Sequence, residues 1–244
     1  MVRAVVFDVD GTLIDHLGAE RAALESIYGS VQQAIQDAPL EEFIEVWHGE
    51  AQRHMQLYLA GELTFTEQRL RRVQSVFGRW GKVVSEGEAM ETFRKYLAEY
   101  ERNWRLYDDV LPCLHCLRNY SLGIVSNGDS KQQRQKLDCT GITVFFASVV
   151  ISGDVGVAKP APGIFERCIT ELGLSPNEVV YVGDCLETDC AGAEQAGLHG
   201  VWLNRRGIDD GTGSSIAAIA SLGQLPGVIR NIDSTRKSQG AKLI

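Results

Sequence analysis

The sequence lacks any uninterrupted apolar run of about 18 residues, the length that a membrane-spanning helix requires. It also lacks a surplus of basic residues, because 24 Lys and Arg stand against 32 Asp and Glu, for a formal net charge of −8. Proteins that bind nucleic-acid polymers usually replace phosphate counterions with a basic face. We therefore expect neither a membrane nor a nucleic-acid partner.

We expect no secretory signal, because residues 1–8 carry one Arg and then run into acidic residues. Cysteine is scarce, with six residues in 244. Cys113 and Cys116 have the CxxC spacing, but no second Cys or His pair at a suitable distance completes a zinc site. The segment also reads as the inside of a helix, where redox motifs do not lie. We expect free thiols in a cytoplasmic protein.

What the sequence does contain is a series of short apolar runs rich in β-branched residues. The first run, residues 2–7, ends at Asp8, and the later runs are 122–125, 149–151, 179–182 and 201–203. Segments with helical character separate them, among them 130–137, 162–172 and 187–196. This alternation predicts an α/β fold with a doubly wound parallel sheet.

Residues 17–105 behave differently, because they show helical periodicity and no convincing strand. We interpret this segment as an inserted helical domain of about four helices, with the core formed by 1–16 and 106–233. The apolar residues within 216–229 are expected to add a sheet edge and one helix. The polar, basic tail, 234–244, is predicted to be disordered.

Polar residues follow the ends of the predicted strands, where an open α/β sheet binds its ligands. They are Asp8, Asp10, Ser126, Asn127, Asp184 and Asp189, and Lys159 lies in the loop before the helix at 162. Several carboxylates in one pocket repel each other, so they need a cation, and oxygen ligands supplemented by water favour Mg²⁺. A metal and a lysine among acids can bind a phosphoryl group. One carboxylate can then act as nucleophile and a second as acid/base.

These residues occur in order as four motifs: Asp8-x-Asp10-Gly-Thr-Leu-Ile, Ser126-Asn-Gly, Lys159 in Val-Ala-Lys-Pro, and Gly183-Asp-x-x-x-Thr-Asp189. On these motifs, residues 2 to about 204 resemble the haloacid dehalogenase superfamily, and the insertion resembles the helical cap of its phosphatases. The resemblance implies that Asp8 is the nucleophile and Asp10 the acid/base. It further implies that Mg²⁺ is held by Asp8, by Asp184 and by the backbone carbonyl of Asp10. Phosphoryl oxygens would bind to Ser126, Asn127 and Lys159. Asp189 would be a water-mediated or outer partner of the metal.

Several of these residues have structural alternatives. Asp8 and Ser126 could serve a turn or a strand end. Asp189 could be a first-turn acid that the helix dipole favours, and Lys159 could be a surface lysine. Asn127 could shape its turn and touch phosphate only through its amide.

Asp10 bears on the choice among the branches of the superfamily. The dehalogenating members lack this second acid, and the phosphonate-cleaving members need a cap lysine, whereas residues 16–63 contain no lysine. Residues 126–136 with 183–189 look like the N-acylneuraminate-9-phosphatases, and residues 149–160 look like the bacterial pyrimidine nucleotidases. If the substrate is a nucleotide, Trp47, Tyr58 and Phe65 are the candidates to stack on its base. For Trp47, packing in the core of the inserted domain is the alternative.

We therefore predict a phosphatase that hydrolyses a small phosphorylated metabolite with Mg²⁺, through an aspartyl-phosphate on Asp8. A sugar-phosphate mutase of the same fold, and a non-catalytic module that binds phosphorylated ligands, are the alternatives. The sequence leaves open whether the metabolite is a nucleotide, a sugar phosphate, phosphoglycolate or a sialic acid phosphate. It leaves the oligomeric state open too.

Overall fold

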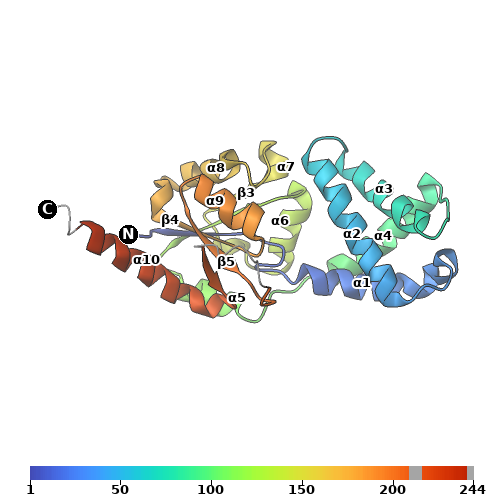
Figure 1. The fold of residues 1–244 in the computed structure, drawn as a ribbon, viewed down its shortest axis with the longest axis horizontal. Helices are drawn as coiled ribbons and strands as arrows, with labels where there is room; N and C mark the ends of the chain where they lie inside the picture. The colour runs from blue at the N-terminus through green and yellow to red at the C-terminus, as the bar shows by residue number, and fades with distance from the viewer. Residues whose placement is uncertain (209–215, 241–244) are drawn as a thin grey trace. The chain divides into compact units, whose positions relative to one another are not determined.

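The computed structural model describes residues 1–208 and 216–240, and the chain divides into two compact units (Figure 1). One unit, called the core here, comprises Met1–Asp15 and Leu106–Ile244. The other, the helical insertion, comprises His16–Arg105. Across the described ranges, no helix combines the length and the apolar character that a membrane crossing requires.

The core is built on a six-stranded sheet with all neighbouring strands parallel, in the order β3-β2-β1-β4-β5-β6. The strands are β1 (Ala4–Phe7), β2 (Ser121–Ser126), β3 (Ser148–Ile151), β4 (Val179–Gly183), β5 (His199–Leu203) and β6 (Ala217–Ile219). All five predicted apolar runs form strands, and β6 is the expected sheet edge. The strand order reverses between β1 and β4, which is where doubly wound sheets bind their ligands.

Helices cover both faces of this sheet. They are α5 (Val110–Cys116), α6 (Ser130–Cys139), α7 (Ser152–Val155), α8 (Pro162–Leu172), α9 (Gly192–Gln195) and α10 (Leu225–Gly240). Figure 1 shows α8 and α9 on one face and α5 and α10 on the other. Alternate residues of β1 point to opposite faces of the sheet. Val5 and Phe7 pack with the α5 and α10 side chains on one face, and Ala4 and Val6 pack with the α8 side chains on the other.

The segment 187–196, predicted as one helix, consists of two parts. A π-helical turn, Leu186–Ala191, precedes α9. The Cys185 carbonyl accepts hydrogen bonds from the backbone N–H of both Asp189 (3.0 Å) and Cys190 (3.3 Å). Asp189 lies in this widened turn, and such π-turns are frequent at functional sites.

The C-terminal helix also differs from the prediction, because α10 continues to Gly240, into the tail predicted to be disordered. The hydroxyls of Ser234 and Thr235 donate to the carbonyls of Arg230 and Asn231, one helical turn earlier. Polar residues of this kind are compatible with a continuing helix when their hydroxyls bond within it. Residues 241–244 lie outside the described part of the chain.

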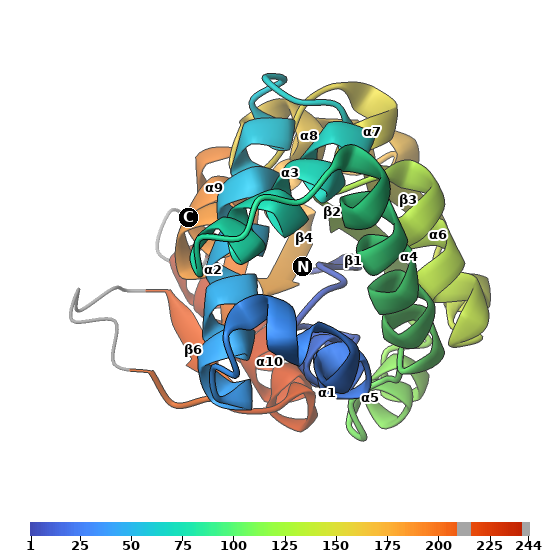
Figure 2. The same cartoon turned by 90° about the vertical axis from the view of Figure 1, so that its right-hand side faces the viewer.

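The helical insertion contains four α-helices, as predicted: α1 (His16–Val31), α2 (Leu40–Leu59), α3 (Phe65–Gly78) and α4 (Glu86–Arg102). Within this unit α1 packs on α4, and α3 packs on both α2 and α4 (Figure 2). Capping boxes at Thr64 and Ser85 begin α3 and α4, and satisfy backbone N–H groups that a helix start leaves open.

Aromatic side chains fill the centre of the helical insertion. Trp47 is 0% exposed, and its ring lies 5.9 Å from that of Phe43 and 4.6 Å from that of Tyr96. Of the two interpretations of Trp47, packing is therefore confirmed and stacking on a nucleotide base is wrong, because the indole lies in the buried centre of this unit. Tyr58 and Phe65 are half-buried and pack on each other, with ring centroids 5.3 Å apart.

Candidate functional site

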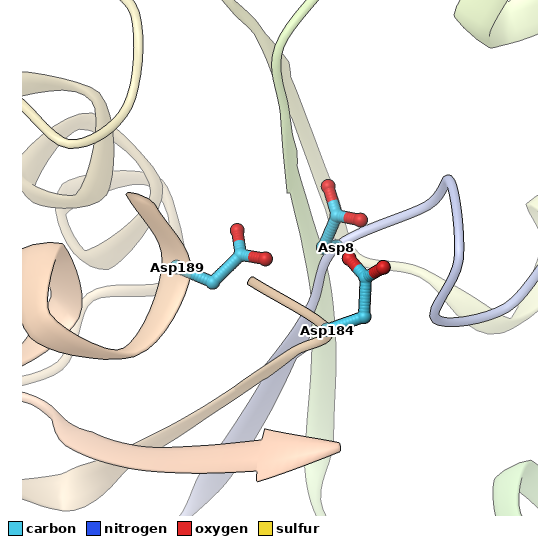
Figure 3. A group of neighbouring side chains, drawn as sticks. All are labelled: Asp8, Asp184 and Asp189. Atoms are coloured by element: carbon cyan, nitrogen blue, oxygen red, sulfur yellow. The ribbon is translucent and has the colours of Figure 1, made fainter. Parts of the chain in front are cut away.

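Three carboxylates converge at the carboxyl ends of β1 and β4 (Figure 3). Asp8 follows β1, Asp184 follows β4, and Asp189 comes from the π-helical turn. One oxygen of each lies within 4.8 Å of the others. The sequence predicted this convergence, because the ends of neighbouring parallel strands meet at one edge of the sheet.

Lys159 is buried between two of these acids. Its Nζ donates to Asp8 Oδ1 and to Asp189 Oδ1, both at 2.6 Å, and to the hydroxyl of Tyr181 at 3.0 Å. The alternative of a surface lysine is thus wrong. The other carboxylate oxygen of Asp189 accepts from the Cys185 backbone N–H at 3.0 Å, so that Asp189 holds Lys159 in place.

Burial and mutual repulsion strongly perturb the acids. Burial is the largest cause that raises the pKa of Asp8 to about 7, with Lys159 opposing it and Asp189 adding to it. Burial likewise raises the pKa of Asp184 to about 8, and the charges of Asp8 and Asp189 contribute. For Lys159, burial alone would lower the pKa, but the two neighbouring carboxylates outweigh burial and raise it. Lys159 is therefore a permanent cation, whereas Asp8 and Asp184 hold protons near neutral pH.

Asp8 and Asp184 fit a hard divalent cation. Their oxygens lie close together. A cation between them would offset burial, which is the largest cause that raises the pKa of both carboxyls, and the charge of Asp8, which further raises the pKa of Asp184. Mg²⁺ accepts one or two carboxylates and completes its shell with carbonyl oxygens and water. The Asp10 carbonyl, the third predicted ligand, belongs to the turn that approaches Asp184.

Gly11 explains why this turn can come so near. Its φ is +83°, and a Cβ at this position would collide with the carboxylate of Asp184. Gly183 has a related function, because a Cβ there would collide with the Asp189 side chain. Gly11 and Gly183, two of the three glycines of the sequence motifs, are thus required by the close approach of an acid.

Asn127 differs from its predicted use. Its side-chain amide donates to the Lys159 carbonyl at 3.0 Å, and its Oδ1 accepts from the Lys159 backbone N–H at 2.8 Å. The side chain therefore fixes the loop that carries Lys159. A phosphate contact by Asn127 is left to its backbone N–H, the alternative that the sequence kept open.

Asp10 and Ser126 lie beside two residues that the sequence analysis missed, Gln133 and Lys136 of α6. The Lys136 ammonium contacts both carboxylate oxygens of Asp10, and the Gln133 amide contacts Asp10 and Ser126. A signal was present in the sequence, because α6 has Leu137 as its one large aliphatic residue. A helix of this composition has to bury polar side chains when it covers a sheet.

Comparison with known proteins agrees with this architecture. Residues 2–197 match the family model of the haloacid dehalogenase-like hydrolases. The chain is 31% identical over 246 residues to the human N-acylneuraminate-9-phosphatase, covering 95% of both chains. It is 32% identical over 216 residues to a glyceraldehyde 3-phosphate phosphatase of Methanopyrus kandleri, covering 86% of this chain and 87% of the relative.

A solved structure shows the same fold. The HAD-hydrolase YfnB of Bacillus subtilis, with magnesium bound, superimposes with a TM-score of 0.77 at 25% identity, covering 94% of this chain and 99% of the other. The family model covers most of the core, including Asp8, Lys159 and Asp184. The chain therefore belongs to the haloacid dehalogenase-like hydrolases.

Proposed function

We propose that this protein is a Mg²⁺-dependent phosphatase that hydrolyses a small phosphomonoester through a phosphorylated Asp8. The observation that carries the proposal is the buried Lys159 ammonium, 2.6 Å from Asp8 Oδ1 and from Asp189 Oδ1. A fixed cation beside a carboxylate nucleophile can receive the negative oxygens of a phosphoryl group. The similarity to an N-acylneuraminate-9-phosphatase and to a glyceraldehyde 3-phosphate phosphatase supports this reaction class.

The two oxygens of Asp8 have different surroundings. Oδ1 accepts from Lys159, whereas no side chain or backbone group of the described residues donates a hydrogen bond to Oδ2. We assign Oδ2 as the attacking atom. In the first step the Oδ2–P bond forms, the P–O bond to the leaving group breaks, and the carboxyl proton of Asp10 passes to the leaving oxygen.

In the second step a water oxygen attacks the phosphorus of phospho-Asp8. Asp10, now a carboxylate, accepts the proton of the water, the P–Oδ2 bond breaks, and inorganic phosphate leaves. Lys159 and the Ser126 hydroxyl bind phosphoryl oxygens during both steps. Mg²⁺, when held by Asp8, Asp184 and the Asp10 carbonyl, supplies positive charge to the phosphoryl oxygens.

The core provides groups for the phosphoryl unit, so the rest of the substrate needs other contacts. We propose that the helical insertion, His16–Arg105, acts as a cap that selects the leaving group, since caps exclude water and complete such sites. The substrates in the relatives' names, an N-acylneuraminate 9-phosphate and glyceraldehyde 3-phosphate, are both small phosphorylated metabolites. We propose a substrate of this class.

The test is phosphate release from a panel of phosphomonoesters with and without Mg²⁺, beside the Asp8→Asn variant. The panel includes nucleoside monophosphates, sugar phosphates, phosphoglycolate and N-acylneuraminate 9-phosphate. We expect metal-dependent release that disappears in the variant. Phosphate that moves within a sugar without appearing in solution would indicate a mutase. Binding of a phosphorylated ligand without any turnover would indicate a non-catalytic module.

A further inference from the structure

We propose that Lys136 and Gln133 of α6 are positioning residues that fix the carboxylate of Asp10 for proton transfer. This inference rests on the proposed function, because Asp10 has a proton to transfer only if the protein cleaves phosphomonoesters. It assigns a defined function to a face of α6 that lies outside the four sequence motifs.

The contacts fix both oxygens of the Asp10 carboxylate. Lys136 Nζ lies 2.7 Å from Oδ1 and 2.7 Å from Oδ2, and Gln133 Nε2 donates to Oδ2 at 3.0 Å. Charge-assisted contacts of this length are among the strongest hydrogen bonds in proteins. Because both oxygens are held, the carboxylate can neither rotate about its last bond nor move away without breaking a contact.

Gln133 also connects Asp10 to the end of β2. The same Nε2 lies 2.8 Å from Ser126 Oγ and 3.3 Å from the Asn127 carbonyl oxygen. One amide group therefore sets the place of the acid/base relative to the hydroxyl that we assign to phosphate binding. Such an arrangement fits a reaction in which the proton and the phosphoryl group have to meet at one leaving oxygen.

The start of α6 determines which side chains reach Asp10. The Asp129 carboxylate accepts from the Gln132 backbone N–H at 3.0 Å and caps the helix directly after the Ser126-Asn-Gly turn. Positions 133 and 136 then fall on one face of the helix, three residues apart. Both side chains are buried there, while Lys131 is exposed.

Stability does not explain a lysine at position 136. Its side chain is 3% exposed, whereas that of Asp10 is 29% exposed. An ammonium loses much of its hydration on burial, and an apolar side chain of similar length in such a place is often as stable or more stable. Hence Lys136 orients Asp10 and adds no stability to the fold. A substitution of Lys136 should therefore lower the catalytic activity without lowering the thermal stability.

The test compares kcat/KM of wild type and Lys136→Met on two substrates with Mg²⁺. 4-Nitrophenyl phosphate has a leaving group that needs no proton, whereas a simple alkyl phosphomonoester needs one. We expect the variant to lose about 10- to 100-fold on the alkyl ester and less than about 3-fold on the aryl ester. Lys136→Arg should restore much of the loss, and the exposed control Lys131→Met should resemble wild type on both.

Equal losses on the two esters, or no loss on either, would overturn the inference. Thermal unfolding shows whether Lys136→Met folds. If it does not fold, Gln133→Leu is compared with wild type on the same two esters, and we expect it to lose kcat/KM selectively on the alkyl ester. A wild-type protein that releases phosphate from no ester would instead overturn the proposed function and this inference with it. The wild-type assay therefore separates the two failures.

Discussion

The core and the helical insertion differ in how their buried charged groups are placed. In the core, Lys159 and Asp189 are buried, and every acid of the site stands at a strand end or in the turn after it. In the insertion, the centre is mostly aromatic, and its buried charged groups do not crowd together: Arg72 donates to the Gln68 side chain, and Glu20 contacts His48. Buried, mutually repelling acids reduce stability, so their presence in the core indicates a function, whereas the aromatic centre of the insertion indicates packing.

Asp8→Asn tests the core side of this comparison and should have the largest effect. Turnover should fall by about 10⁴-fold or more, because the proposed nucleophile is removed. Thermal stability at pH 8 should be unchanged or higher, because burial raises the pKa of Asp8 to about 7 and thus disfavours its charged form in the folded protein. Single-turnover phosphate release measures the turnover, and thermal denaturation measures the stability. Loss of activity together with loss of stability would contradict this separation.

Trp47→Ala tests the packing side. The free energy of unfolding should fall by about 3–5 kcal/mol, because a fully buried indole leaves a cavity between Phe43 and Tyr96. Mg²⁺ affinity should stay unchanged, because the proposed ligands all belong to the core. Denaturant unfolding and a metal titration check the two parts. Trp47→Phe, as a milder control, should lower the free energy of unfolding by clearly less than Trp47→Ala.

Arg205→Met addresses a contact in the core beyond the four motifs. Arg205 contacts both carboxylate oxygens of Asp109 (2.8 and 2.9 Å) and donates to the Thr12 carbonyl (3.0 Å). It therefore connects the turn after Asp8 to the start of α5. We expect a loss of about 1–3 kcal/mol for this partly buried pair. Arg206→Met is the neighbouring control, and equal unfolding curves for the two variants would contradict the expectation.

The smallest expected effect is a pH-dependent stabilisation by Mg²⁺. The pKa of Asp8 is raised to about 7 and that of Asp184 to about 8, against about 3.9 for an unfolded aspartate. Between these values the folded protein binds more protons than the unfolded chain, so these groups make the metal-free protein less stable as pH rises from about 4 to 8.

Mg²⁺ has to displace those protons, so it should raise Tm more at pH 8 than at pH 5.5, by a few degrees. Differential scanning calorimetry at both pH values, with and without the metal, measures the difference. Asp184→Asn should remove most of it. An equal rise in Tm at both pH values would show that the acids do not bind the metal in competition with protons.

The sequence predicted the core well, because strand ends are local features and a parallel sheet brings them together. Asp8, Lys159 and Asp184 could be placed in one site from their positions after strands or before a helix. Lys136 could not, because its partner Asp10 lies 126 residues away and only the packing of α6 shows which polar side chains turn inward.

In the helical insertion, the sequence predicted the helices but not the roles of their aromatic side chains. Its periodicity predicted four helices, but period alone does not distinguish a packed aromatic from one that meets a ligand. Trp47 proved to be packed inside the unit, while Tyr58 and Phe65 are half-buried. The use of Asn127 was equally hidden, because its side chain pairs with the backbone of Lys159, 32 residues away.

The most direct test of the central claim is to trap the phosphorylated enzyme. The wild-type protein is mixed with Mg²⁺ and a ³²P-labelled substrate from the panel, quenched in acid within one turnover, and digested for peptide mapping. The account predicts hydroxylamine-sensitive label on the peptide that contains Asp8, and none in Asp8→Asn. Turnover without covalent label, or label on another residue, would contradict it.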